Sequence, residues 1–108
     1  MIAVSAHVLL ASPQDTERFC ELAVGLIEPT RQEPGCTLYA MARDIADDCV
    51  VWISEEWDSN AHLDAHLRTE HIAQFLGELA NVNIVSMEDK KYEVSSVGHV
   101  EMPPATNA

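Results

Sequence analysis

Basic residues are scarce in this sequence. Lysine and arginine together number 6, against 18 aspartate and glutamate residues, which gives a formal net charge of −12. Such a surface repels the phosphates of nucleic acids and of anionic membranes, and no basic stripe offsets the repulsion locally. We therefore predict no nucleic-acid partner and no membrane partner, while the charge favours solubility.

Cysteine is scarce as well. Cys20, Cys36 and Cys49 are odd in number, lie far apart and include no CxxC pair, a pattern typical of free thiols in a reducing compartment. The apolar stretch from residue 1 to residue 12 has no basic n-region and no A-x-A cleavage site, and it is too short to span a bilayer. We therefore expect a cytoplasmic protein.

Motifs for nucleotide binding and for nucleophilic serine are also lacking. The sequence contains no GxGxxG, no phosphate-binding glycine loop and no GxSxG, so it implies no nucleotide cofactor. His62 and His66 have the i, i+4 spacing of two metal ligands, but HLDAH is not HExxH and no cysteine or carboxylate is placed to complete a ligand set. We expect no metal, and a solvated helix face at His62.

What the sequence does contain is the pattern of one globular domain. It has 108 residues, of which 47% are hydrophobic, enough for one modest core. Residues 2–10 predict a strand, and Ser12-Pro13 then predicts the start of a helix. That helix carries an apolar stripe with helical spacing and is ended by Pro34-Gly35. The stripe consists of Phe19, Leu22, Ala23, Leu26 and Ile27.

The remaining elements complete a β-α-β-β-α-β order. Residues 36–43 and 49–57 predict an antiparallel hairpin, residues 58–80 a second helical region, and residues 84–97 a last strand with a charged patch at 88–91. This order predicts an α+β, ferredoxin-like fold with an antiparallel sheet, a domain over 1–97 and a flexible tail over 98–108. Two helices cover one sheet face, so we expect the other face to pack on a second copy in a homodimer.

The second helical region contains a break in phase. Its apolar stripe turns by more than a quarter turn between Leu67 and Ile72, so we predict two helices, the second capped by Thr69. His66 then lies in a last turn, where the helix dipole favours a protonated ring, and His71 in a first turn, where it favours a neutral one. Such a pair suits acid–base catalysis; the alternative is two partly exposed histidines without a role.

Further candidate site residues lie on the two hairpin strands. Glu55 shares one face of its strand with Trp57, and Trp52 lies on the other face. If Glu55 points into the core, its apolar surroundings raise its pKa; if the strand end emerges into water, Glu55 is an ordinary surface residue. Tyr39 could stack on an aromatic ligand or belong to an interface core.

The sequence resembles the antibiotic biosynthesis monooxygenase family over roughly residues 2–97. The resemblance rests on Glu33-Pro34-Gly35-Cys36, Tyr39, the Glu55-x-Trp57 pair, and His66 and His71 followed by Phe75. It implies a dimeric α/β barrel with a hydrophobic pocket in each subunit. Members include cofactor-free monooxygenases in which a deprotonated quinol, anthrone or other polyketide-like aromatic itself reduces dioxygen, so that the protein binds, deprotonates and excludes water.

The resemblance also covers other activities. A haem-degrading branch uses an asparagine, a tryptophan and a histidine where this sequence has His7, His66 and Leu76, and these departures argue against haem. We therefore expect a cofactor-independent monooxygenase, with His66 or His71 as the base and Glu55 as its orienter or an alternative base. Tyr39, Trp52 and Trp57 are the expected substrate-binding residues, as walls of the pocket. The alternatives are a small-molecule isomerase and a non-catalytic ligand-binding or structural dimer.

Overall fold

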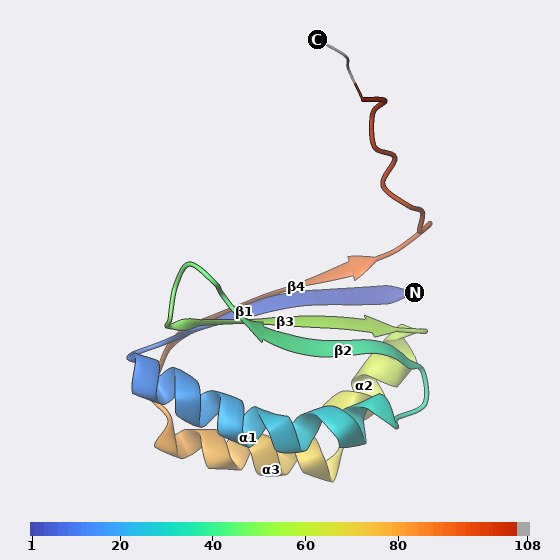
Figure 1. The fold of residues 1–108 in the computed structure, drawn as a ribbon. Helices are drawn as coiled ribbons and strands as arrows, with labels where there is room; N and C mark the ends of the chain where they lie inside the picture. The colour runs from blue at the N-terminus through green and yellow to red at the C-terminus, as the bar shows by residue number, and fades with distance from the viewer. Residues whose placement is uncertain (106–108) are drawn as a thin grey trace.

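A computed structural model describes residues 1–105 of the chain. A four-stranded antiparallel sheet has the strand order β2-β3-β1-β4 and carries its helices on one face (Figure 1). The elements in chain order are β1 (Ile2–Leu10), α1 (Pro13–Arg31), β2 (Cys36–Arg43), β3 (Val50–Trp57), α2 (Asn60–Leu67), α3 (Glu70–Glu78), the 3-10 helix η1 (Leu79–Asn81) and β4 (Ile84–Glu93). The predicted ferredoxin-like α+β fold is confirmed.

The core lies between the sheet and the helices. Val8, Phe19 and Trp57 are completely buried there, because alternate residues of each strand point to the helix side and the apolar stripe of α1 faces the sheet. The opposite face of the sheet stays open (Figure 1). On it Leu38, Trp52 and Tyr92 are 39%, 41% and 49% exposed, so the described chain leaves large apolar side chains in contact with solvent.

The first helix begins where the sequence predicts. The Ser12 hydroxyl accepts a hydrogen bond from the backbone N–H of Asp15 at 3.1 Å, and Pro13 occupies the first turn. A capping hydroxyl satisfies an N–H that has no partner within the helix, and proline has the backbone angle that a first turn requires. The helix continues through Pro29 to Arg31, and the chain then turns into β2 at Gly35.

The predicted break in the second helical region is confirmed. Helix α2 ends at Leu67 and α3 begins at Glu70, with Thr69 as its N-cap. The Thr69 hydroxyl accepts from the backbone N–H of Ile72 at 3.4 Å and donates to the carbonyl of His66 at 2.8 Å. This one side chain therefore links the end of α2 to the start of α3.

We expect Thr69→Ala to lower the free energy of unfolding by about 1 kcal/mol, because it removes the cap of α3 and its bond to His66. Thr69→Ser keeps the hydroxyl and is the matched control. Urea denaturation of both variants measures the effect. Equal stability of Thr69→Ala and the unsubstituted protein would contradict the capping role.

The last strand is shorter than predicted: it ends at Glu93 and not at residue 97. It lies at the edge of the sheet, and its charged segment 88–91 is exposed to water, as charged residues on an edge strand commonly are. Residues 94–105 contain no helix or strand and run away from the domain on the open side of the sheet (Figure 1). The division into a 1–97 domain and a 98–108 tail stays a prediction, and its residues 106–108 lie outside the described part.

Within residues 1–105, no helix is both long enough and apolar enough to cross a membrane.

Candidate functional site

Three segments bring Glu33, His66 and His71 together, and we call these residues the bridged triad. Glu33 comes from the turn between α1 and β2, His66 from the last turn of α2 and His71 from the first turn of α3. One carboxylate oxygen, Glu33 Oε2, lies 2.7 Å from His66 Nδ1 and 2.8 Å from His71 Nε2. An ionised carboxylate can only accept, so both of these ring nitrogens carry a hydrogen.

This arrangement leaves one free nitrogen on each ring. With neutral imidazoles, Nε2 of His66 and Nδ1 of His71 have no hydrogen and can take a proton. The two side chains differ in access, because that of His66 is 2% exposed and that of His71 is 26% exposed. His71 therefore reaches solvent, while His66 faces the protein interior.

The surroundings of His66 are aromatic on two sides and acidic on a third. Its ring centroid lies 4.6 Å from that of Trp57 and 5.5 Å from that of Tyr39. Glu55 Oε1 is 3.9 Å from His66 Nε2 and accepts a 2.9 Å hydrogen bond from the indole N–H of Trp57. The free nitrogen of His66 is thus enclosed by a carboxylate and two rings.

Burial raises the pKa of Glu55, although the Trp57 hydrogen bond and the neighbouring His66 oppose the shift. Glu55 therefore points into the protein interior and not into water, which is the first of the two alternatives that the sequence left open. A carboxyl group with a raised pKa can retain its proton at a higher pH than usual. Glu55 can then donate as well as accept, which is useful beside a base.

We expect Glu55→Gln to change the pH dependence of stability. Because the folded-state pKa of Glu55 is raised, the folded state holds this proton more tightly than the unfolded state. The free energy of unfolding of the natural protein should fall as pH rises from the ordinary pKa of 4.5 through the folded value. Glutamine keeps an acceptor for Trp57 and does not titrate. The free energy of unfolding of the variant should therefore increase relative to that of the natural protein as pH rises through this window.

Urea denaturation at a series of pH values measures the difference. Glu56→Gln, which removes a charge from the neighbouring position on the open face, is the control for a general charge effect. A stability difference between Glu55→Gln and the natural protein that does not vary with pH would refute the proposed linkage.

Two further groups near the triad are held in their neutral forms. Burial strongly raises the pKa of the Tyr39 hydroxyl, and the charges of Glu55 and Glu33 add to the shift. Burial and the same two carboxylates also raise the pKa of the Cys36 thiol. Tyr39 therefore remains a hydrogen-bond donor, and Cys36 is not an activated nucleophile.

Trp52 lies away from the other predicted site residues. Tyr39, Glu55 and Trp57 face the helices together with His66, whereas Trp52 is on the open face of the sheet. Its indole N–H donates to Asp44 at 2.8 Å, and its ring lies 4.8 Å from that of His7. Trp52 and Tyr39 therefore cannot line one cavity within a single chain.

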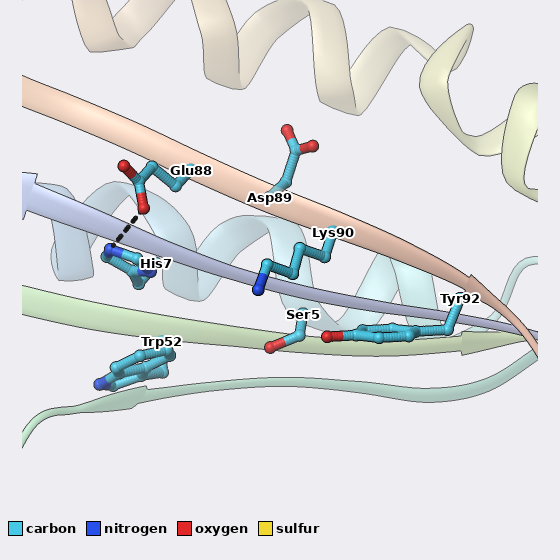
Figure 2. A pocket seen from close by; sticks show the side chains of 7 residues that line it. All are labelled: Ser5, His7, Trp52, Glu88, Asp89, Lys90 and Tyr92. Carbon is cyan, nitrogen blue, oxygen red and sulfur yellow. Dashed lines mark ion pairs between the residues drawn. The ribbon is translucent and has the colours of Figure 1, made fainter.

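Trp52 instead belongs to a shallow depression of about 480 Å³ on the open face. Figure 2 shows its lining side chains, which come from β1, β3 and β4, and the 3.5 Å contact between His7 and Glu88. The lining residues are Ser5, His7, Trp52, Glu88, Asp89, Lys90 and Tyr92.

Glu33 is the site residue that the sequence analysis did not assign. It lies 33 positions before His66, and no local periodicity relates the two. The available signal was Gly35, whose φ of 78° turns the chain back directly after Glu33.

The expectation of a solvated helix face at His62 is wrong. His62 is half-buried, forms a 2.8 Å hydrogen bond with Ser59 and packs over Gly35.

Next to His71 there is a groove between α1 and α3. Its volume is about 210 Å³, and its lining combines apolar side chains with polar ones from α3. The lining residues are Leu22, Gly25, Leu26, His71, Gln74, Phe75 and Glu78. A small molecule in this groove would meet the exposed edge of the triad.

The triad is also the set of described residues that could hold a metal ion. One ligand atom from each of Glu33, His66 and His71 lies within 4.8 Å of the other two. Two imidazole nitrogens and a carboxylate oxygen are ligands that zinc and iron accept. The expectation that no carboxylate is placed to complete a ligand set is wrong for His66, because Glu33 meets it together with His71 and not with His62.

Comparison with known proteins identifies the family. The fold defines the class as ferredoxin-like α+β proteins, and residues 1–78 match the antibiotic biosynthesis monooxygenase family. The chain belongs to this family, as the resemblance in the sequence indicates. Membership supports a monooxygenase-type function in general terms, without defining the substrate.

Individual relatives resemble the chain in sequence and, where solved, in fold. A candidate antibiotic biosynthesis monooxygenase from Deinococcus radiodurans is 25% identical and superposes with a TM-score of 0.85, over 94% of this chain and 99% of that one. A conserved protein from Methanosarcina mazei Go1 is 27% identical, with a TM-score of 0.77 over 84% and 89% of the two chains. An uncharacterized protein of Synechocystis sp. is 30% identical over 92 residues, which cover 85% of this chain and 63% of that protein. The chain thus spans less than two thirds of this curated relative.

Proposed function

We propose that the protein is a cofactor-independent monooxygenase that oxidises a quinol or polyketide-like aromatic with dioxygen. The observation that carries the proposal is the bridged triad, in which Glu33 orients two imidazoles at 2.7 and 2.8 Å. A carboxylate that fixes the tautomer of an imidazole leaves the other ring nitrogen as a general base. Family membership supplies the reaction type, and the triad supplies the proton acceptor that this reaction needs.

The proposed reaction begins with removal of a proton from the substrate. His66 or His71 takes it, and the resulting electron-rich anion reduces dioxygen. For an anthrone-type CH₂ group, one oxygen atom becomes a carbonyl oxygen and the other leaves as water with the two hydrogens. The substrate supplies the electrons, so the atoms balance without another reductant. Tyr39 and Trp57 are the proposed aromatic walls, and Glu55 assists as an acid or an alternative base.

We further propose that the working form is a homodimer joined through the open faces of the sheets. The exposed Leu38, Trp52 and Tyr92 support this proposal, because a second copy could cover them. Trp52 would then belong to the dimer interface and could act on substrate only from there. The thiols Cys20, Cys36 and Cys49 are free, which supports a location in the cytoplasm.

Oxygen uptake by purified, chelator-treated protein with a panel of quinols and anthrones tests the function. We expect uptake of one dioxygen per anthrone oxidised, without added flavin or haem. No uptake with any member of the panel, with or without flavin, would refute the proposal. Light scattering tests the dimer separately, and a monomer would exclude the interface role of Trp52.

The same acid–base pair favours one second candidate, an isomerase for a small oxo compound. Isomerisation moves a proton from one carbon to another and consumes no dioxygen. Substrate turnover that proceeds equally well under anaerobic conditions would therefore select this candidate. A ligand that binds without turnover would instead select the non-catalytic dimer.

A further inference from the structure

We propose that Glu33, His66 and His71 form a binding site for one divalent first-row transition-metal ion of the zinc class. The proposal concerns binding alone, and it does not rest on the monooxygenase function. Its basis is a ligand set that already converges, because the three donor atoms lie within 4.8 Å of one another. Two histidines and one carboxylate make up the ligand set of many zinc and non-haem iron sites.

The donor atoms need only a small rearrangement to hold an ion. Ligands at ~2.0–2.1 Å around a tetrahedral zinc ion lie roughly 3.4 Å apart. The two contacts of Glu33 Oε2, at 2.7 and 2.8 Å, would each open by about 0.6 Å as the ion enters. The two imidazole nitrogens, which lie within 4.8 Å of each other, would close towards the same separation. Small side-chain rotations can supply this movement, since Glu33 comes from a turn and both histidines lie at helix ends.

The hydrogen atoms can also be accommodated. An ion on Nδ1 of His66 requires the hydrogen of the neutral ring to move to Nε2, where Glu55 Oε1 lies 3.9 Å away. Histidine ligands of metals usually donate their second N–H to a carboxylate or a carbonyl, which fixes the ring. Glu55 is placed to be this partner after a small approach, and the indole of Trp57 holds it at 2.9 Å.

Burial and access favour an ion as well. The side chains of Glu33 and His66 are 11% and 2% exposed, so water competes weakly for them. His71, at 26% exposure, borders the groove between α1 and α3, which provides an entry path and an open coordination position. The net charge of −12 attracts cations to the molecule as a whole.

Bound metal would oppose the proposed base catalysis. The ion would occupy the atoms that now set the tautomers, and Nε2 of His66 would carry a hydrogen instead of accepting one. We therefore expect zinc to inhibit the cofactor-free reaction and a chelator to restore it. Inhibition by zinc rests on the proposed monooxygenase function, whereas metal binding can be measured without any activity.

Titration of the chelator-treated full chain with Co²⁺ tests the site, because cobalt bound by nitrogen and oxygen at low coordination number has a strong visible absorption. We expect saturation at one ion per chain, displacement by Zn²⁺ and no displacement by excess Mg²⁺. His71→Gln and Glu33→Gln should each weaken binding at least ~100-fold, and Glu55→Gln should weaken it about 10–100-fold as the loss of an outer partner.

Matched controls come from the other histidines. His7→Gln removes a histidine that also faces a glutamate, Glu88 at 3.5 Å, but on the open face, and His62→Gln removes the i, i+4 neighbour of His66. Both should bind cobalt as the natural protein does. Circular dichroism confirms that each variant is folded. Absence of saturable binding, or undiminished binding in folded His71→Gln, would overturn the proposal.

Discussion

Gly35→Ala is expected to destabilise the protein by about 2–3 kcal/mol, from two additive causes. Gly35 has a φ of 78°, and this left-handed conformation costs an L-residue roughly 1–2 kcal/mol. A Cβ added here would also lie 2.6 Å from Cδ2 and 2.7 Å from Nδ1 of His62. The imidazole would have to move and break its 2.8 Å bond to Ser59, at a cost of about 1 kcal/mol.

A matched glycine distinguishes these causes from a general glycine effect. Gly77 lies within α3, and an added Cβ there meets nothing within 4 Å, so Gly77→Ala should stabilise by up to about 1 kcal/mol through helix propensity. The double variant Gly35→Ala/His62→Ala should remove the overlap and retain the backbone strain. Urea denaturation gives all three values. A loss below about 0.5 kcal/mol in Gly35→Ala would contradict the argument.

The same turn explains what the sequence could and could not predict about the site. The break at Thr69 was predictable, because the phase of an apolar stripe is a local property of consecutive residues. So was the placement of His66 and His71 on either side of it. Glu33 approaches them only because a left-handed residue turns the chain there and β2 then pairs with β3. No pattern within a single element contains that information.

The strand residues show a second limit. Alternation along β3 separated Glu55 and Trp57 from Trp52, but alternation does not say which face the helices cover. The crossover of α1 between the parallel strands β1 and β2 decides this, and it places the helices on the side of Glu55, which lies 3.9 Å from His66. Of the residues proposed for the site from the sequence, Tyr39, Glu55 and Trp57 lie with His66 on the helix side, whereas Trp52 faces the other way.

The fold itself was more predictable than the site, and for a related reason. Element order and the short hairpin link leave few arrangements for a chain of this length. The end of β4 was placed too late because Val94 and Val97 favoured a longer strand, whereas the pairing of β4 with β1 ends at Glu93, opposite Ile2. The backbone N–H of Val94 still reaches the carbonyl of Met1 at 2.9 Å, just before β1 begins.

Glu33→Gln is expected to lower kcat of the proposed reaction by about 10²–10⁴, the range that general-base catalysis contributes. The natural carboxylate accepts from both imidazoles at once. A glutamine amide has lost the charge, so its oxygen accepts more weakly from the two rings and no longer stabilises the imidazolium that forms when one of them takes a proton. The free ring nitrogen is then a weaker proton acceptor for the substrate.

Two measurements separate this role from a structural one. Nitrogen NMR of the imidazoles should show neutral His66 with its hydrogen on Nδ1 in the natural protein and a larger share of the other tautomer of His66 or His71 in Glu33→Gln. KM should change little, because Glu33 is proposed to orient the base and not to contact the substrate. Glu21→Gln, an exposed charge on α1, should leave both readouts unchanged. Unaltered tautomers together with full activity in Glu33→Gln would remove Glu33 from the mechanism and leave Glu55, 3.9 Å from His66, as the remaining carboxylate beside that ring.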